Sequence, residues 1–337
     1  MSIRLSRSTI QMTTPPGILS FAAIVGKKEG EGPLARYFDS VEQDTTFGES
    51  SWEKAESRMQ AETVAKALQK GALAPDDIDL IFAGDLLNQG IASTFGLREL
   101  EIPLVGLYGA CSTMAESLMM ASLFVDNGLA LRTVAVTSSH FCSAERQFRL
   151  PLEYGGQRTP SAQWTATAAG AAVVTAQDGP PFVKAVTIGR IRDLGIKDAA
   201  DMGAAMAPAA HDTILTHLKD TGNVPQGFDL ILTGDLGEIG GKLANDLLLR
   251  DNVDIRDRYN DCGLLLYDRG PQDVHAGGSG CGCSASVLCG YILDKLRVGE
   301  LQNVLFVATG ALMSPTSVQQ GESIPGIAHA VHLSHTR

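Results

Sequence analysis

Apolar and polar residues alternate along the chain with two periods, one typical of helices and one typical of strands. In SWEKAESRMQAETVAKALQ (residues 51–69) apolar residues recur at helical spacing with charges between them, which predicts an amphipathic helix. The run DIDLIFAGDLL (residues 77–87) is short, apolar and bounded by turn formers, as is typical of a buried strand in a parallel sheet. Another β-like run, at residues 17–25, follows a polar lead-in that ends near Pro16. Strands that alternate with helices indicate the α/β class.

The hydrophobic pattern also repeats within the chain. The segment DIDLIFAGDL at residues 77–86 recurs as GFDLILTGDL at residues 227–236. The tripeptide ACS around Cys111 has the counterpart GCS around Cys283, and a helical stretch and an apolar strand follow each of them. From each cysteine to the threonine of that strand the spacing is 26 residues in both copies. Matched elements at matched spacing predict two copies of one unit.

We assign the first copy to residues 1–178 and the second to residues 179–337. The junction is placed in the turn-rich segment AQDGPP, near residues 176–181. Units of this length are paired domains and not the short repeats of a solenoid.

Composition and charge narrow the classes of function. The 337 residues carry a net charge of -11, with 27 Lys and Arg against 38 Asp and Glu, so a basic nucleic-acid surface is not expected. Six cysteines in a chain of this length without a secretory signal favour reduced thiols over a disulfide framework. No run reaches 18 consecutive apolar residues, so we expect no transmembrane segment and no signal peptide.

The stretch LYGACSTMAESLMMA (residues 107–121) predicts a strand-to-helix elbow with Cys111 at the start of the helix. Unpaired N–H groups and the helix dipole at such a position lower the pKa of a thiol. The elbow therefore makes Cys111 a candidate nucleophile.

Two α/β halves with a cysteine at an elbow in the first half resemble the thiolase-like plan of thiolases and ketoacyl synthases. The motifs SWEKAE, GACST, EYGGQ, DMGAAMAPAA, AGGSGCGCSA and VATGALMSPT, together with others between residues 17 and 329, resemble the stage V sporulation protein AD family. The resemblance implies a five-layered αβαβα body. It also implies a spore protein that binds dipicolinic acid and supports its uptake into the developing spore and its release at germination.

The resemblance further implies the setting in which the protein acts. Other stage V sporulation A proteins are the expected partners, and the location is the spore inner membrane, with peripheral association. Thiolase-like proteins pair through a sheet edge, so a homodimer is expected. No cofactor, metal or nucleic acid is implied, beyond a Ca²⁺ ion that could accompany dipicolinate.

In enzymes of this fold the cysteine works with a His and a second His, Asn or Cys on two loops of the second half. The corresponding loops here, residues 233–241 and 276–285, contain Asp, Glu, Ser and Cys but neither His nor Asn. This pattern favours a binding pocket made from a former active site, with no catalytic residue. The alternative is an acyltransferase with Cys111 as nucleophile and His275 or His329 as base. A third hypothesis is a scaffold with a vestigial pocket that holds membrane partners.

Dipicolinate is a planar aromatic dianion, so its pocket needs donors for two carboxylates and an apolar or sulfur surface for the ring. The helix start offers Cys111 and Ser112, and the second loop of the second half offers Ser279. Arg146 and Arg149 follow the strand that ends near residue 139, so we expect them on a loop at the same sheet edge.

Asp85, Asn88 and His140 complete the predicted ligand-binding set. Asp85 and Asn88 occupy the loop after a parallel strand, where α/β folds gather their ligands, and His140 follows another such strand. Because an Asp repels a dianion, Asp85 fits if it orients an Arg, pairs with a Lys or holds the Ca²⁺.

Each of these residues also has a structural interpretation. Cys111 can be a small buried apolar residue, Asp85 can cap the following helix, and His140 can be a loop histidine with its hydrogen bonds satisfied. Arg146 and Arg149 can pair with Glu145 and Glu153 at the surface. The sequence leaves these alternatives open.

Overall fold

The computed structural model describes residues 2–148, 158–176 and 179–337. The strands are β1 (Ile3–Arg4), β2 (Thr9–Gln11), β3 (Gly17–Gly26), β4 (Ser40–Glu42), β5 (Leu80–Gly84), β6 (Leu104–Leu107), β7 (Arg132–Ser139), β8 (Trp164–Thr165), β9 (Ala168–Thr175), β10 (Phe182–Thr187), β11 (Leu230–Thr233), β12 (Tyr259–Asp261), β13 (Gly278–Ser279), β14 (Asn303–Ala311) and β15 (Gly326–Ser334). The α-helices are α1 (Lys27–Gly30), α2 (Trp52–Lys70), α3 (Ile91–Leu97), α4 (Thr113–Asp126), α5 (Phe141–Phe148), α6 (Met202–Thr221), α7 (Gly237–Arg250), α8 (Cys262–Leu266), α9 (Cys281–Val287), α10 (Leu293–Arg297) and α11 (Pro315–Gln319).

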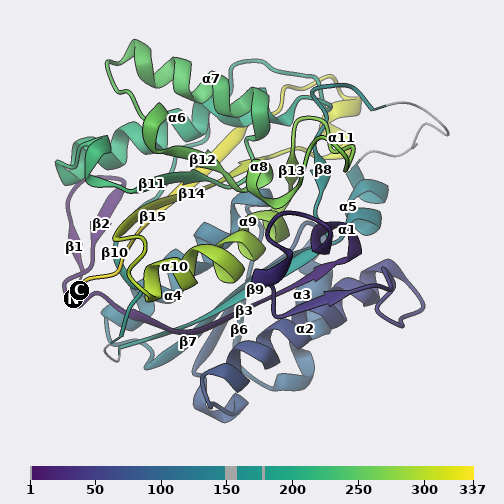
Figure 1. The fold of residues 1–337 in the computed structure, drawn as a ribbon, viewed down its shortest axis with the longest axis vertical. Helices are drawn as coiled ribbons and strands as arrows, with labels where there is room; N and C mark the ends of the chain where they lie inside the picture. Colours follow the sequence, from purple (N-terminus) through teal and green to yellow (C-terminus); the bar gives the residue numbers. More distant parts are fainter. Residues whose placement is uncertain (1, 149–157, 177–178) are drawn as a thin grey trace.

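The two halves of the chain build sheets with the same strand order. The first runs β3, β9, β7, β5, β6, and the second runs β10, β15, β14, β11, β12. In each sheet the first two pairings are antiparallel and the last two are parallel. A pairing of Phe182 with Gly17 joins the sheets edge to edge (Figure 1). The internal repeat read from the sequence therefore reappears as repeated topology, and the predicted boundary at residue 178 lies outside the described residues.

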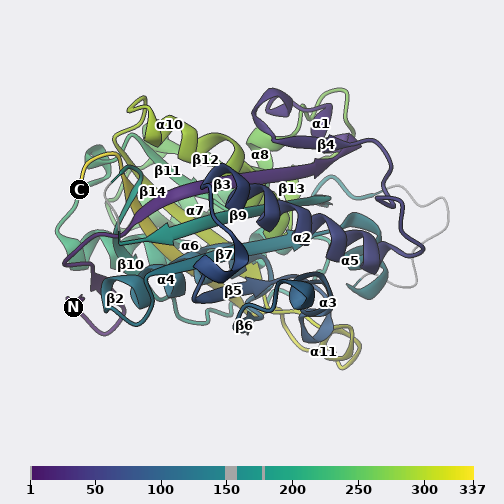
Figure 2. The same ribbon diagram turned by 90° about the horizontal axis from the view of Figure 1, so that it is seen from below.

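Helices separate and cover the two sheets in five layers. Helices α2 and α3 pack on the outer face of the first sheet (Figure 2), and α6 packs on the outer face of the second with α7 beside it (Figure 1). Helix α4 contacts β5, β7 and β9 on one side and β14 and β15 on the other, and α9 lies beside it. The layers run α, β, α, β, α, which confirms the predicted thiolase-like fold.

The environment of each helix explains its pattern of residues. The predicted helix at residues 51–69 is α2, and the Lys54 N–H donates to Oγ of Ser51 at its N-cap (3.4 Å). Helix α2 is amphipathic because one face meets a sheet and the other meets solvent. Helix α4 is buried on almost every side, so its apolar residues extend around the whole helix.

A small parallel sheet, β8 with β13, ties the two halves together beside the elbow. It pairs Trp164 with Gly278 and Thr165 with Ser279. Next to it, Nε2 of Gln163 donates to the carbonyl oxygens of Asp235 (2.6 Å) and Gly278 (2.9 Å). Segments distant in sequence are thus fixed at one place, where the candidate site lies.

The N-terminal segment differs from the expected polar lead-in, because it forms β1 and β2. Strand β2 pairs with β10, and Oγ1 of Thr9 lies 3.0 Å from Oγ1 of Thr187. Short polar strands of this kind give no apolar alternation that the sequence pattern could reveal.

Candidate functional site

The predicted elbow is present, and it turns Cys111 and Ser112 in different directions. A 3₁₀ turn, Ala110–Ser112, connects β6 to α4, and Ala110 has φ of 52°, in the left-handed region that residues other than glycine rarely adopt. Oγ of Ser112 donates to the carbonyl oxygen of Gly109 (2.7 Å), which closes the turn. Cys111 is 7% exposed and faces a cavity.

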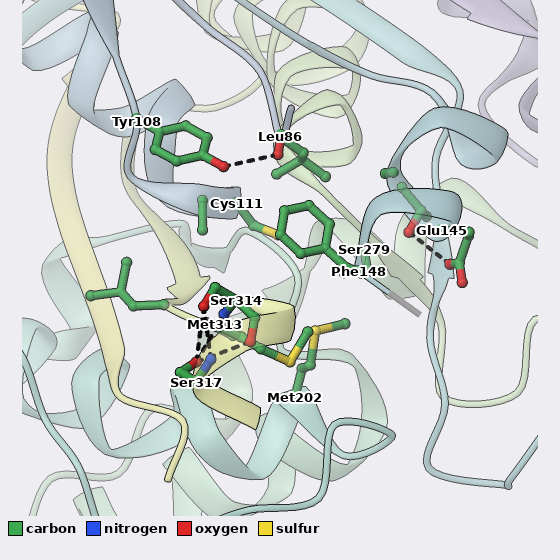
Figure 3. Close-up of a pocket in the computed structure, with 15 residues that line it drawn as sticks. Leu86, Tyr108, Cys111, Glu145, Phe148, Met202, Ser279, Met313, Ser314 and Ser317 are labelled. Atoms are coloured by element: carbon green, nitrogen blue, oxygen red, sulfur yellow. Dashed lines mark hydrogen bonds between the residues drawn. The ribbon is translucent and has the colours of Figure 1, made fainter. Parts of the chain in front are cut away.

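The cavity has a volume of about 360 Å³, within the usual range for small-molecule sites. Figure 3 shows its walls, with Phe148 beside Cys111 and Met202 and Met313 across from them. The lining residues are Leu86, Tyr108, Ala110, Cys111, Ala144, Glu145, Phe148, Thr165, Met202, Ser279, Ala311, Leu312, Met313, Ser314 and Ser317. Most of this surface is apolar, aromatic or thioether, with a few hydroxyls.

Behind the floor lies Asp235, from the loop after β11. Its Oδ2 accepts from Oγ of Ser279 (3.1 Å) and from the Gly280 N–H (2.9 Å), and its Oδ1 accepts from Oγ1 of Thr309 (2.8 Å). The Cys111 thiol lies near enough to this carboxyl for each group to affect the pKa of the other. The fold thus brings both loops of the second half to the cysteine, and the groups they present are a carboxyl and a hydroxyl.

The electrostatics of this floor contradict the activated thiol expected from the helix start. Burial is the main cause that raises the pKa of the Cys111 thiol well above its usual value, and the neighbouring Asp235 raises it further. Burial also raises the pKa of Asp235. Desolvation and a nearby acid outweigh the helix dipole, so Cys111 is a neutral thiol near pH 7.

One wall of the cavity is polar. Glu145 on α5 is 4% exposed, and its Oε1 accepts from Oγ1 of Thr165 (3.0 Å). Arg158 reaches the same Oε1 from outside the lining, at 3.5 Å. The N-termini of α4 and α6 also meet the cavity, through the Cys111 turn and through Met202. The start of α4 therefore offers the positive end of its dipole, whereas the Asp201 carboxyl already caps the start of α6 and accepts from the Ala204 N–H (3.2 Å).

Asp85 and Asn88 lie outside the lining. Asp85 is fully buried, and its carboxylate accepts from the Leu87 N–H (2.9 Å) and from the N–H (2.9 Å) and Oγ (2.7 Å) of Ser93. This arrangement agrees with the capping interpretation, since Ser93 lies in the first turn of α3. Oδ1 of Asn88 accepts from the hydroxyl of Tyr108 (3.3 Å), so Asn88 contacts a residue that lines the cavity without lining it itself.

The basic and imidazole candidates also lie away from the cavity. Arg146 is on helix α5 and not on a loop, and its guanidinium pairs with Glu53 and lies over the ring of Trp52. Nε2 of His140 lies 2.7 Å from the carbonyl oxygen of Thr45, as in a satisfied histidine. Arg149 lies outside the described residues. Of the predicted set, the structure brings only Cys111 and Ser279 to the cavity among the residues it describes.

Sequence reasoning missed Asp235 as a floor residue and Glu145, Phe148, Met202 and Met313 as walls. The internal repeat could have indicated one of these residues, Met313. Met313 follows β14, the counterpart of β7, so the loop after the third matched strand could have been assigned to the same edge as the elbow. For α5 the one-turn spacing from Glu145 to Phe148 marks a shared helix face, but only after α5 is recognised as a helix.

The part of the chain that is described contains neither a cluster of metal ligands nor a membrane-spanning helix. No cluster of three His, Cys, Asp or Glu side chains there could hold a metal ion. No helix there is both long enough and apolar enough to cross a membrane.

Comparisons with known proteins agree with the fold and define the family. The family described as "Stage V sporulation protein AD (SpoVAD)" matches residues 6–334. Stage V sporulation protein AD of Bacillus subtilis (strain 168) is 47% identical over 317 residues, which cover 94% of each chain.

Solved structures of distant relatives share the fold. The 3-oxoacyl-[acyl-carrier-protein] synthase III of Aquifex aeolicus VF5 has a TM-score of 0.57 at 13% identity, with 95% of this chain and 99% of that chain covered. Cerulenin-bound OleA of Xanthomonas campestris has a TM-score of 0.60 at 13% identity, with 99% and 100% covered. At these identities the likeness extends to the fold alone.

Proposed function

The chain belongs to the stage V sporulation protein AD family, and on that premise we propose that it binds dipicolinic acid in the Cys111 cavity. The protein holds the ligand without converting it, and supports its entry into the developing spore and its release at germination. It works beside other stage V sporulation A proteins, in peripheral association with the spore inner membrane.

One observation carries the proposal, namely a largely apolar cavity whose floor is a neutral thiol backed by a carboxyl. Nucleophilic catalysis needs a thiolate and a base within hydrogen-bond reach. Cys111 has a raised pKa and Asp235 as its partner, and no His or Asn lines the cavity in the described part of the chain. Such a floor favours binding over acyl transfer.

The walls suit a flat aromatic acid. Phe148, Met202 and Met313 offer ring and thioether surfaces to the two faces of a pyridine ring. The N-terminus of α4 favours its carboxylates, whereas the hydroxyls of Thr165 and Ser279 already donate to Glu145 (3.0 Å) and Asp235 (3.1 Å).

The charge of Glu145 bears on the form of the ligand. A carboxylate in the wall repels a bare dianion, whereas the calcium chelate of dipicolinate has no net charge. The Glu145 oxygens could also supply a further oxygen ligand to Ca²⁺. We therefore expect the chelate to bind at least as tightly as the free acid.

Calorimetric titration of the purified protein with dipicolinate tests the proposal, with and without Ca²⁺. Phe148→Ala should weaken binding because the ring loses its stacking partner. Phe95→Ala, an aromatic deletion at a 54% exposed site outside the cavity, is the matched control and should bind as the wild type does.

The same preparation separates the rival functions. Incubation with acyl-CoA followed by mass spectrometry detects acylation of Cys111. Stable acylation together with no heat of dipicolinate binding would overturn the proposal in favour of an acyltransferase. No response in either assay, with co-sedimentation alongside other stage V sporulation A proteins, would point to the scaffold.

We also propose a homodimer formed through β6. This strand ends the first sheet, pairing with β5 on one side, and Leu104 and Val105 are each more than one-third exposed. Unpaired edge strands with apolar side chains favour pairing with another strand. Sedimentation velocity should give a dimer for the wild type and a monomer for Val105→Lys, and a wild-type monomer would reject this interface.

A further inference from the structure

The two halves of the chain send matched connections to the cavity. Strands β7 and β14 hold the same position in their sheets, and each leads back to an antiparallel neighbour, β9 or β15. The β7–β9 connection carries α5, and the β14–β15 connection carries α11. The residues with which these connections line the cavity are Ala144, Glu145, Phe148 and Thr165 in the first and Leu312, Met313, Ser314 and Ser317 in the second (Figure 3).

Helix α5, in the first of these connections, is fixed to the body of the protein. Oγ of Ser143 donates to Oε2 of Glu56 (2.8 Å), and Nε2 of Gln147 donates to the carbonyl oxygen of Leu86 (3.3 Å). Ser143 and Ala144 are buried. This wall of the cavity is therefore held by side chains along the helix.

The matching segment of the second half, residues 314–320, has no such attachment among the residues that the structure describes. Every hydrogen bond of this segment stays within residues 314–322, including the cap in which Oγ of Ser314 accepts from the Ser317 N–H (3.1 Å). No residue of α11 is buried. The β14–β15 connection is also far longer than the roughly two to five residues usual between paired strands.

The two ends of this segment, in contrast, are held. At one end the Leu312 N–H donates to the carbonyl oxygen of Pro325 (2.8 Å), and Met313 packs against an apolar cluster of the second half. At the other end Nζ of Lys197 donates to the carbonyl oxygen of Gly321 (2.7 Å), which has a φ of 78°. A loop with close, fixed ends is typical of Ω-loops, which are frequently functional.

We propose that residues 314–320 are a lid, which swings about Met313 and Gly321 to admit the ligand and then closes over it, while α5 is the fixed wall. Opening is easy because no residue of α11 leaves a buried position and because the hydroxyls of Ser314 and Ser317 stay bonded to each other (3.2 Å). Segments that move during binding are drawn from such weakly held parts of a protein. The role of the lid rests on the proposed function.

A lid has a kinetic signature that a fixed wall lacks. The ligand enters and leaves only while the lid is open, so removal of the lid raises both the association and the dissociation rate constant. Removal of a wall that only contacts the ligand raises the dissociation rate constant alone.

Stopped-flow mixing with dipicolinate compares the wild type with a variant in which three glycines replace residues 314–320. The fluorescence of Trp164, which precedes the cavity residue Thr165, reports binding. With a lid that is open about one-tenth of the time, association should be about tenfold faster in the variant. Dissociation should accelerate by more, because the closed lid also contacts the ligand. Faster dissociation with unchanged association overturns the lid, and so do unchanged rates.

Lys197→Ala tests the lid without shortening the chain, since Lys197 lies outside the lining of the cavity. Loss of its bond to Gly321 should raise both rate constants about threefold. Lys242→Ala removes another exposed lysine, which pairs with Glu238 on α7, and is the matched control that should leave both constants unchanged. Wild-type rates in Lys197→Ala reject Gly321 as the pivot.

Modification of Cys111 by a bulky maleimide tests the lid without dipicolinate. Cys111 is 7% exposed at the cavity floor, so the reagent must pass through the cavity. Mass spectrometry should show about tenfold faster modification of Cys111 in the three-glycine variant than in the wild type. Equal rates overturn the lid. Faster modification in a protein that binds no dipicolinate upholds a lid over the cavity and overturns the proposed function.

Discussion

Gly310 on β14 is the most direct point at which to test the packing of the elbow. Strand β14 packs against the 3₁₀ turn that holds Cys111. A Cβ atom added at Gly310 would lie 2.6 Å from the carbonyl oxygen of Gly109 and 3.1 Å from the nitrogen of Ser112. Both are backbone atoms at the two ends of the turn, so neither can move without shifting Cys111. We predict that Gly310→Ala destabilises the protein.

The size of the effect follows from the cost of overpacking. Forcing one extra methyl group into a well-packed interior costs about 1–3 kcal/mol. At roughly 2.1 cal/mol/K per residue, a chain of 337 residues has an unfolding entropy of roughly 0.7 kcal/mol/K. The melting temperature should therefore fall by about 1–4 °C.

Differential scanning calorimetry measures this shift, and Gly227→Ala is the control. Gly227 lies before β11, where an added Cβ would meet no atom within 4 Å, so its melting temperature should stay close to that of the wild type. If Gly310→Ala melts together with Gly227→Ala, the turn is not tightly packed against β14 and the reasoning is wrong.

Three further predictions follow from charges and contacts. Burial raises the pKa of Asp261 to about 7 from its usual 3.8, so the free energy of unfolding should fall as pH rises through this interval, by up to about 1.4 kcal/mol per pH unit. Urea titrations should show a slope that is steeper by this amount in the wild type than in Asp261→Asn, because other buried acids with a raised pKa, such as Glu56, contribute equally to both proteins. Iodoacetamide should alkylate Cys111 slowly at about pH 8, and Asp235→Asn should speed the reaction by removing the acid that raises the thiol pKa; equal rates by mass spectrometry would contradict this account. Arg146→Ala should leave the affinity for dipicolinate unchanged, because Arg146 pairs with Glu53 outside the cavity. A marked loss of affinity in calorimetry would show that Arg146 contacts the ligand.

Much of the fold could be predicted because buried positions require apolar residues, which recur in the sequence with the period of a helix or a strand. The helix α2, the strand β5 and the repeated order of elements all follow from apolar periodicity, and the elbow follows from small residues before a helix. The family resemblance then supplied the layer order, which the contacts of the helices with the two sheets confirm.

The site was harder to predict because its residues meet only in three dimensions. Asp85 and Asp235 occupy equivalent places in the two copies, yet Asp85 binds the backbone of its own loop while Asp235 backs the cavity floor. Nothing in the local sequence separates these roles. Arg146 was misplaced because α5 was taken for a loop, and on a helix a one-residue step rotates a side chain about 100° away from its neighbour Glu145.

The pairing of β8 with β13 also bears on the order of folding. The hydrogen bond from Gln163 to Gly278 closes a loop of 115 residues and joins the two halves of the chain, so it cannot form until the second half takes part in folding. Thr165 and Ser279, which line the cavity, depend on that closure. An early folding intermediate with only its first sheet formed would therefore have the cysteine elbow but no enclosed cavity, so ligand binding should appear only as the chain completes its folding.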